Sequence, residues 1–172
     1  DVKYPRLGLT FKRGSTRLHV GGKGATVNMH YCADLSESFL CNFGGEQAVL
    51  LVKPHEAKFT YEPPLGFESI PTVDYSSSGI KKNPAIKNLN AYYAELRHGD
   101  VLYIPSGYRY SVHYLTPSIG LTMSAEAATL KARIFGLINT VVLNPLDKAC
   151  FQVFGDSWYR RKLRKAVRRS KR

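Results

Sequence analysis

The sequence predicts a mainly β fold, in which a small antiparallel barrel is followed by a helical extension and a basic tail. Three observations predict it. Short apolar segments alternate with glycine and proline turns as far as residue 126. Apolar residues then recur at helical spacing. Finally, nine of the last thirteen residues are Lys or Arg. We therefore expect a barrel over residues 1–126, a helical extension over 127–157 and a basic tail over 158–172.

Four strands are predicted in the first half of the barrel. Alternation or an apolar run marks each of them, and glycine turns or Pro54 separate or end them. They cover residues 17–20, 25–31, 39–43 and 47–53. A loop-rich segment follows over residues 55–90, which is rich in proline and serine and is expected to be a long insertion between the two halves of the barrel.

The second half resumes with four more predicted strands. The turn Gly99-Asp100 precedes a short apolar strand, and Pro105-Ser106-Gly107 turns the chain into another. These strands cover residues 91–97, 101–104, 110–114 and 118–124.

Residues 127–143 are predicted to form a helix that ends at Pro145, with residues 146–157 as a connection. No stretch reaches the roughly 18 unbroken apolar residues that a membrane span needs. The most apolar part, residues 134–143, contains Gly136, Asn139 and Thr140. It is therefore expected to be a buried or docking helix, and no transmembrane span is predicted.

Several of these motifs together resemble a known family. They are His30-Tyr31, Asn42-Phe43-Gly44-Gly45 and the run Gly99-Asp100-Val101-Leu102-Tyr103-Ile104-Pro105-Ser106-Gly107. Over residues 15–126 the chain resembles the JmjC-type cupins, many of which are iron(II) and 2-oxoglutarate dioxygenases. The resemblance implies an antiparallel cupin barrel, also called a double-stranded β-helix.

The resemblance also implies a degenerate metal site. Active members bind iron through a His-x-Asp/Glu pair and a distant His, because residues two apart on a strand face the same way. Here His30 matches the first histidine, Cys32 stands at the acidic position and Tyr110 at the distal histidine. Asp34 would supply the carboxylate if the alignment shifts and the strand continues. We expect no catalytic residue, no metal and no cofactor; iron(II) and 2-oxoglutarate belong only to the alternative of an active oxygenase.

The competing interpretation of these residues is structural. His30 would be a core histidine, Tyr110 a barrel-filling aromatic and Cys32 a small buried side chain. His113 has the opposite strand parity to Tyr110 and should face outward. The remaining histidines, His19, His55 and His98, are expected at the surface or in loops.

The three cysteines form no CxxC motif and suit neither a zinc site nor a disulfide framework, so we expect reduced thiols. The net charge of +12 indicates a polyanionic partner. Most of the excess comes from a run of predicted RNA-binding residues: Arg160, Arg161, Lys162, Arg164, Lys165, Arg168, Arg169, Lys171 and Arg172.

In isolation this basic run would be disordered or frayed, whereas phosphate contacts would release counterions. No base-reading motif is visible, so recognition would be of backbone and shape. Trp158 and Tyr159 are expected to anchor the tail. An acidic protein, an anionic membrane surface or a merely solvated tail remain alternatives.

The sequence therefore predicts a non-catalytic structural or accessory subunit of a large assembly. We expect a ribonucleoprotein such as an organellar ribosome, with rRNA and neighbouring proteins as partners. The expected location is an organelle matrix, mitochondrial in the first instance, with cytoplasmic or nuclear alternatives. The other functional hypotheses are an active hydroxylase acting on protein or RNA, and a scaffold subunit of a membrane-bound complex.

Overall fold

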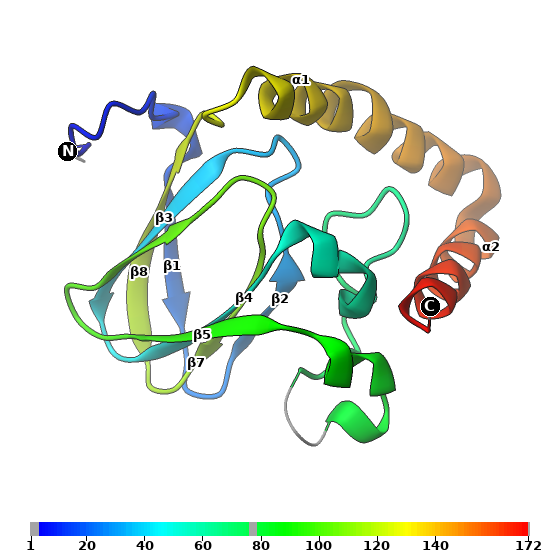
Figure 1. Ribbon diagram of the computed structural model, residues 1–172, viewed down its shortest axis with the longest axis horizontal. Helices are drawn as coiled ribbons and strands as arrows, with labels where there is room; N and C mark the ends of the chain where they lie inside the picture. Colours follow the sequence, from blue (N-terminus) through cyan, green and yellow to red (C-terminus); the bar gives the residue numbers. More distant parts are fainter. Residues whose placement is uncertain (1–3, 76–78, 172) are drawn as a thin grey trace.

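Two antiparallel four-stranded sheets form the barrel in the computed structural model, which describes residues 4–75 and 79–171. The first sheet has the order β1-β8-β3-β6, and the second has the order β2-β7-β4-β5 (Figure 1). In chain order the strands are β1 (Arg17–Gly21), β2 (Thr26–His30), β3 (Glu37–Gly44), β4 (Gln47–Val52), β5 (Ala91–Leu96), β6 (Val101–Ile104), β7 (Arg109–Tyr114) and β8 (Ser118–Ala125). All eight coincide with predicted strands, and the mainly β fold is confirmed.

The barrel core consists of side chains that both sheets direct inward. Leu40 and Ile104 come from the first sheet, and Val49, Val112 and Tyr114 come from the second. Because successive residues of a strand point to opposite faces, each strand contributes every second side chain to this core. Burial of these apolar side chains joins the two sheets.

The insertion between the barrel halves is ordered over its described residues. It contains the 3₁₀ helices Pro54–Thr60, Gly79–Lys81 and Pro84–Asn88. Tyr61, Ala85 and Ile86 give it a small apolar core of its own. Residues 67–69 lie beside β2, where the Tyr31 N–H donates to the Phe67 carbonyl at 3.0 Å and the Ser69 N–H donates to the Met29 carbonyl at 2.7 Å. The insertion therefore covers the β2 edge of the second sheet.

The helical extension differs from the prediction. It passes without a loop through α1 (Leu130–Ile138), a π-helical segment (Asn139–Leu143) and α2 (Asn144–Ser170), and α2 is kinked at Gly155. The prediction that Pro145 ends the helix is wrong, and so is the connection predicted over residues 146–157. Proline lacks an N–H and clashes with the preceding turn of a regular α-helix. The π-helical turn just before Pro145 changes the hydrogen-bond spacing, and the helix continues through it.

The basic tail is also helical over its described residues, whereas in isolation it was expected to be disordered or frayed. A kink at Gly155, with φ 51° and ψ −135°, separates the tail from the preceding helix. Two bonds cross this kink: Trp158 Nε1 donates to Asp147 Oδ1 at 2.9 Å, and Lys162 Nζ donates to Asp147 Oδ2 at 2.6 Å. Ala166 is only 1% exposed. Tertiary contacts of this kind stabilise a helix that its own charge would destabilise, and Trp158 anchors the tail as predicted.

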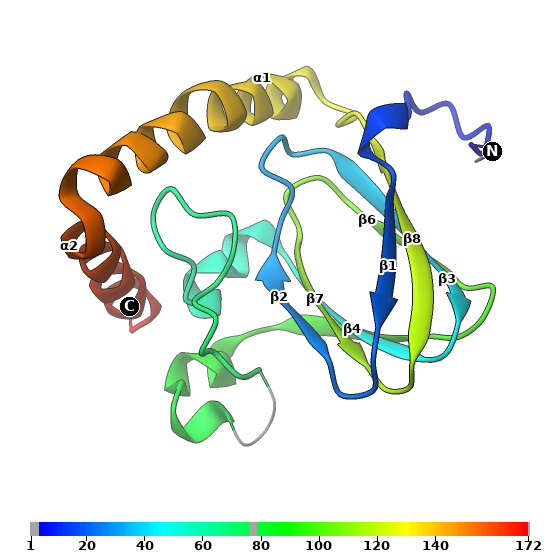
Figure 2. The same ribbon diagram turned by 180° about the vertical axis from the view of Figure 1, so that it is seen from behind.

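Residues 130–154, here called the apolar arm, arch away from the barrel (Figures 1 and 2). Their large apolar side chains are exposed, so the helix is not buried within this chain, and the other predicted alternative, a docking helix, stays a prediction. The exposed side chains are Leu130, Ile134, Phe135, Leu137, Ile138, Val141, Val142, Leu146, Phe151, Val153 and Phe154.

By length and composition, the helix over residues 130–170, which is kinked at Gly155, could cross a membrane, and only 6% of its most apolar stretch is buried. One such helix is weak evidence of a span. The expectation of no transmembrane span therefore stays a prediction.

Candidate functional site

His30 and Tyr110 face each other inside the barrel. Strands β2 and β7 place them directly opposite, with ring centroids 4.3 Å apart and ring planes inclined by 50°. His30 Nδ1 lies 2.7 Å from the Asn28 carbonyl oxygen. A carbonyl can only accept, so Nδ1 carries the proton that it donates. The aromatic ring of Tyr110 thus stands beside the imidazole, where the family pattern has a second histidine.

Cys32 lies close to the same pair. Its sulfur is 3.5 Å from the Ser38 hydroxyl on β3. Burial raises the pKa of Tyr110, with a further contribution from Cys32 and an opposing one from Arg17. Tyr110 is therefore a neutral phenol at physiological pH. Three of the four predicted metal-site positions come together here.

The fourth position, Asp34, lies elsewhere. Strand β2 ends at His30, so the strand does not continue far enough to bring Asp34 onto its inner face. Asp34 accepts instead from Lys12 Nζ at 2.6 Å and from the Ser36 hydroxyl at 2.7 Å. Burial opposes ionisation, but these hydrogen bonds outweigh it and lower the pKa of Asp34. Asp34 thus ties the lead-in to the turn after β2.

These residues do not fit the iron site of the active oxygenases. That site needs two imidazoles and one carboxylate around open coordination positions. Within residues 4–75 and 79–171, no three His, Cys, Asp or Glu side chains are grouped closely enough to hold a metal ion. His113 is exposed on the outer face, as its strand parity predicts.

The family resemblance also implies a lysine or arginine that holds the cosubstrate carboxylate, and its position, shortly after Gly45, falls near Gln47. Gln47 is buried there, and its amide nitrogen donates to Asn42 Oδ1 at 3.0 Å. An amide cannot hold a carboxylate by the charge-assisted bonding that lysine or arginine supplies. No step of oxygenase chemistry can therefore be assigned to these side chains.

Sequence reasoning missed His19 of β1. It was expected at the surface or in a loop, but it is half-buried and its Nε2 lies 2.7 Å from the Thr122 hydroxyl on β8. Burial lowers the pKa of His19, and the nearby charges of Arg17 and His30 lower it further. The alternation in residues 17–20 could have indicated the inward position of His19, because alternate residues of a strand share a face. Leu18 and Val20 lie on the opposite, outer face, where they are 64% and 75% exposed. The inner wall of this strand is therefore polar.

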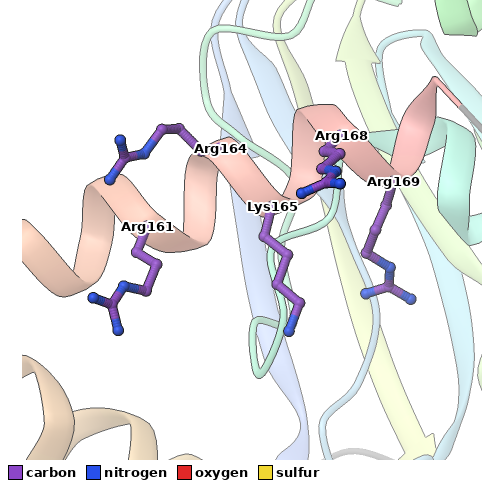
Figure 3. A pocket seen from close by; sticks show the side chains of 5 residues that line it. All are labelled: Arg161, Arg164, Lys165, Arg168 and Arg169. Atoms are coloured by element: carbon purple, nitrogen blue, oxygen red, sulfur yellow. The ribbon is translucent and has the colours of Figure 1, made fainter.

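The second candidate site is the basic helix, defined here as residues 156–170. Arg161, Arg164, Lys165, Arg168 and Arg169 line one surface depression (Figure 3). Figure 3 shows these side chains extended from the helix, with Arg161, Lys165 and Arg169 on the same side of it. No carboxylate lines this depression, and clustered arginines in such a place match anionic oxygens.

The other predicted tail residues divide into three groups. Arg160 is exposed beside a neighbouring depression, and Lys171 is exposed beyond the end of the helix. Lys162 is engaged by Asp147 and is only 12% exposed. Arg172 lies outside the described residues. The available cations are thus fewer than the sequence count.

Comparison with known proteins identifies relatives of the barrel. Residues 5–160 match the family described as "Cupin-like domain". "JmjC domain-containing protein D" of Dictyostelium discoideum is 31% identical over 105 residues, which are 59% of this chain and 23% of that protein. "tRNA wybutosine-synthesizing protein 5" of Mus musculus is 24% identical over 106 residues, which are 62% of this chain and 32% of that protein. The chain thus spans a third or less of these curated relatives.

Proposed function

The chain belongs to the cupin-like domain family, and on that premise we propose that it is a non-catalytic accessory subunit of a ribonucleoprotein. Its barrel would serve as a rigid scaffold, and its basic helix would bind RNA phosphates. The expected host is a large assembly such as an organellar ribosome in the mitochondrial matrix. The observation that carries the proposal is the cluster of five unopposed cations on the basic helix.

The barrel interior supports the non-catalytic part of the proposal. Tyr110 packs against His30 where the active pattern requires a metal-binding imidazole, and Asp34 is held by Lys12. A phenol with a raised pKa and a thiol make a poor ligand set for iron(II) beside oxygen-based cosubstrates.

The basic helix supports the RNA part. Arginine forks match phosphate oxygens, and a rigid helix loses less entropy on binding than a disordered tail would. A relative has tRNA in its name, which makes structured RNA a suitable first probe. With about five phosphate contacts, log Kd should change with log salt concentration by a slope of roughly 3.5 to 4.5.

Fluorescence anisotropy with labelled tRNA across a KCl series tests this. Replacing Arg161, Arg164 and Lys165 together by Gln should weaken binding at least tenfold and reduce the salt slope by roughly 2 to 3. The control replaces the exposed residues Lys23, Lys82 and Lys87 by Gln, which removes the same charge elsewhere. An equal loss in both variants, or no binding by the wild type at 50 mM KCl, would refute the RNA proposal. Cosedimentation with organellar ribosomal subunits tests the proposed host.

The active hydroxylase remains the second candidate, because His30 and Cys32 share the barrel interior. Anaerobic reconstitution with iron(II), followed by metal analysis and 2-oxoglutarate binding, separates the two candidates. Stoichiometric iron that is lost in His30→Ala would overturn the non-catalytic proposal. Iron no higher than in His30→Ala would support it.

A further inference from the structure

The apolar arm and the basic helix adjoin each other, and we propose that together they dock the protein on the surface of an anionic phospholipid bilayer. The arm would lie in the plane of the interface with its apolar side chains among the acyl chains. The cations of the basic helix would meet the lipid phosphates. This inference goes beyond RNA binding, because it rests on the arm, which RNA phosphates would not contact.

The first argument is the exposed apolar area. Eleven large apolar side chains of the arm are 39% to 73% exposed. At typical side-chain areas they present on the order of 1,000 Å², against about 300–600 Å² for the largest apolar patch of an ordinary soluble monomer. Such an area must be covered by something in the functional state.

The second argument is which side of the arm is already engaged. Asn139 Nδ2 donates to the Ala33 carbonyl at 3.0 Å, and the Asp147 carboxylate accepts from Trp158 and Lys162. The polar side of the arm therefore faces its own protein. Leu137 and Val141, each 62% exposed, remain on the free side. An amphipathic helix with its apolar side outward is the form that interfacial helices take.

The third argument is charge, and it selects the lipid class. The basic helix follows the arm directly, and its five clustered cations have no carboxylate among them. Each cation near an anionic membrane surface contributes attraction that salt weakens. The net charge of +12 repels a second copy of this chain, so charge complementarity favours a bilayer over self-association.

The docked ends of the helix indicate that it lies on the bilayer and does not span it. Gly136 packs against the backbone of Asp34 so closely that a Cβ atom would lie 2.0 Å from the Asp34 carbonyl oxygen. At the other end, Ala166 and Ser170 are buried, and α2 contacts the 3₁₀ helix Pro54–Thr60. A spanning helix would have to release its contacts with both the turn after β2 and the insertion. An interfacial helix can keep them.

Flotation of the full chain with unilamellar vesicles tests the proposal. Vesicles of phosphatidylcholine and phosphatidylglycerol in a 7:3 ratio should bind the protein at least tenfold better than phosphatidylcholine alone. Replacing Ile134, Leu137 and Val141 together by Gln should lower binding to anionic vesicles at least tenfold. The matched control replaces three exposed apolar residues of the first sheet by Gln, namely Leu18, Val20 and Ile119, and should bind as the wild type does.

Three results would overturn the proposal. They are absence of wild-type binding to anionic vesicles at low salt, undiminished binding by the arm variant, and a lipid-free wild-type dimer that the arm substitutions turn into a monomer. The last result, measured by light scattering, would assign the arm to a second copy.

The arm variant also keeps this proposal separate from RNA binding. Its affinity for tRNA and its salt slope should equal those of the wild type, because its basic helix is intact. Loss of vesicle binding with RNA binding retained supports lipid docking whether or not RNA is the physiological ligand. Loss of both would show that the arm substitutions disturb the basic helix, and would overturn the separate role of the arm.

Discussion

Replacing Gly136 by Ala should destabilise the protein, although alanine favours a helix by about 1 kcal/mol over glycine. The added Cβ would lie 2.0 Å from the Asp34 carbonyl oxygen, which is 1.4 Å closer than ordinary contact allows. The atoms that the added Cβ would meet are all backbone atoms of Asp34, so the clash cannot be relieved by rotating a side chain. The helix must move outward, which strains or breaks the bond from Asn139 to the Ala33 carbonyl.

The magnitude follows from these opposing effects. Overpacking costs about 1–3 kcal/mol. Loss of one hydrogen bond costs about 1 kcal/mol more. The gain in helix propensity offsets about 1 kcal/mol of this, so the net loss is about 1–3 kcal/mol. For a chain of this size that corresponds to a Tm lower by roughly 3–10 °C.

Thermal unfolding followed by circular dichroism measures this change. Leu137→Ala is the control, since it adds alanine at the next position of the same helix on an exposed side chain. It should change Tm much less. A Gly136→Ala variant as stable as the wild type would refute the close packing of α1 on the turn after β2.

Two further predictions concern ion pairs. Arg109 holds Glu62 through two bonds, from Nε at 2.9 Å and Nη2 at 3.2 Å, and both side chains are at most 15% exposed. Arg109→Met should therefore lower the free energy of unfolding, measured with urea, by about 3–5 kcal/mol, because it leaves a buried carboxylate without its partner. Adding Glu62→Gln to this variant should recover part of the loss. A double variant with no recovery would contradict the pairing. The second prediction is that Asp34→Asn is less stable than the wild type at pH 7. The pKa of Asp34 in the folded protein lies below its usual 3.8, so the difference in stability is fully present above pH 3.8 and should disappear as the pH falls through the folded pKa. Urea midpoints of the two proteins that differ equally at pH 7 and pH 2 would contradict this prediction.

The strands could be predicted from the sequence because each is local. Turns such as Gly99-Asp100 indicated where the strands begin and end. The alternation of side chains between the two faces of a strand placed Tyr110 on the inner face. The helical extension could not be predicted, because its course depends on tertiary contacts. The helix continues through Pro145, which follows a π-helical turn, and the charged tail is helical because Asp147 and the 3₁₀ helix Pro54–Thr60 of the insertion hold it.

The candidate site was predictable to the same degree. His30, Cys32 and Tyr110 come together because strand pairing places them there. Asp34 does not join them, because β2 ends four residues earlier and Lys12, distant in sequence, pairs with it. No local pattern reveals that partnership. His19 could have been identified, had the alternation of β1 been interpreted with its polar side inward.

The junction around Gly155 and Asp147 has a consequence for how such a protein can diversify. The direction of the basic helix relative to the arm depends on one glycine with open space around it and on one carboxylate that holds two partners. None of these groups belongs to the barrel core. Substitutions at this junction could therefore re-aim the cationic surface toward a differently shaped polyanion while the barrel stays unchanged, so the scaffold and its recognition surface are free to evolve separately.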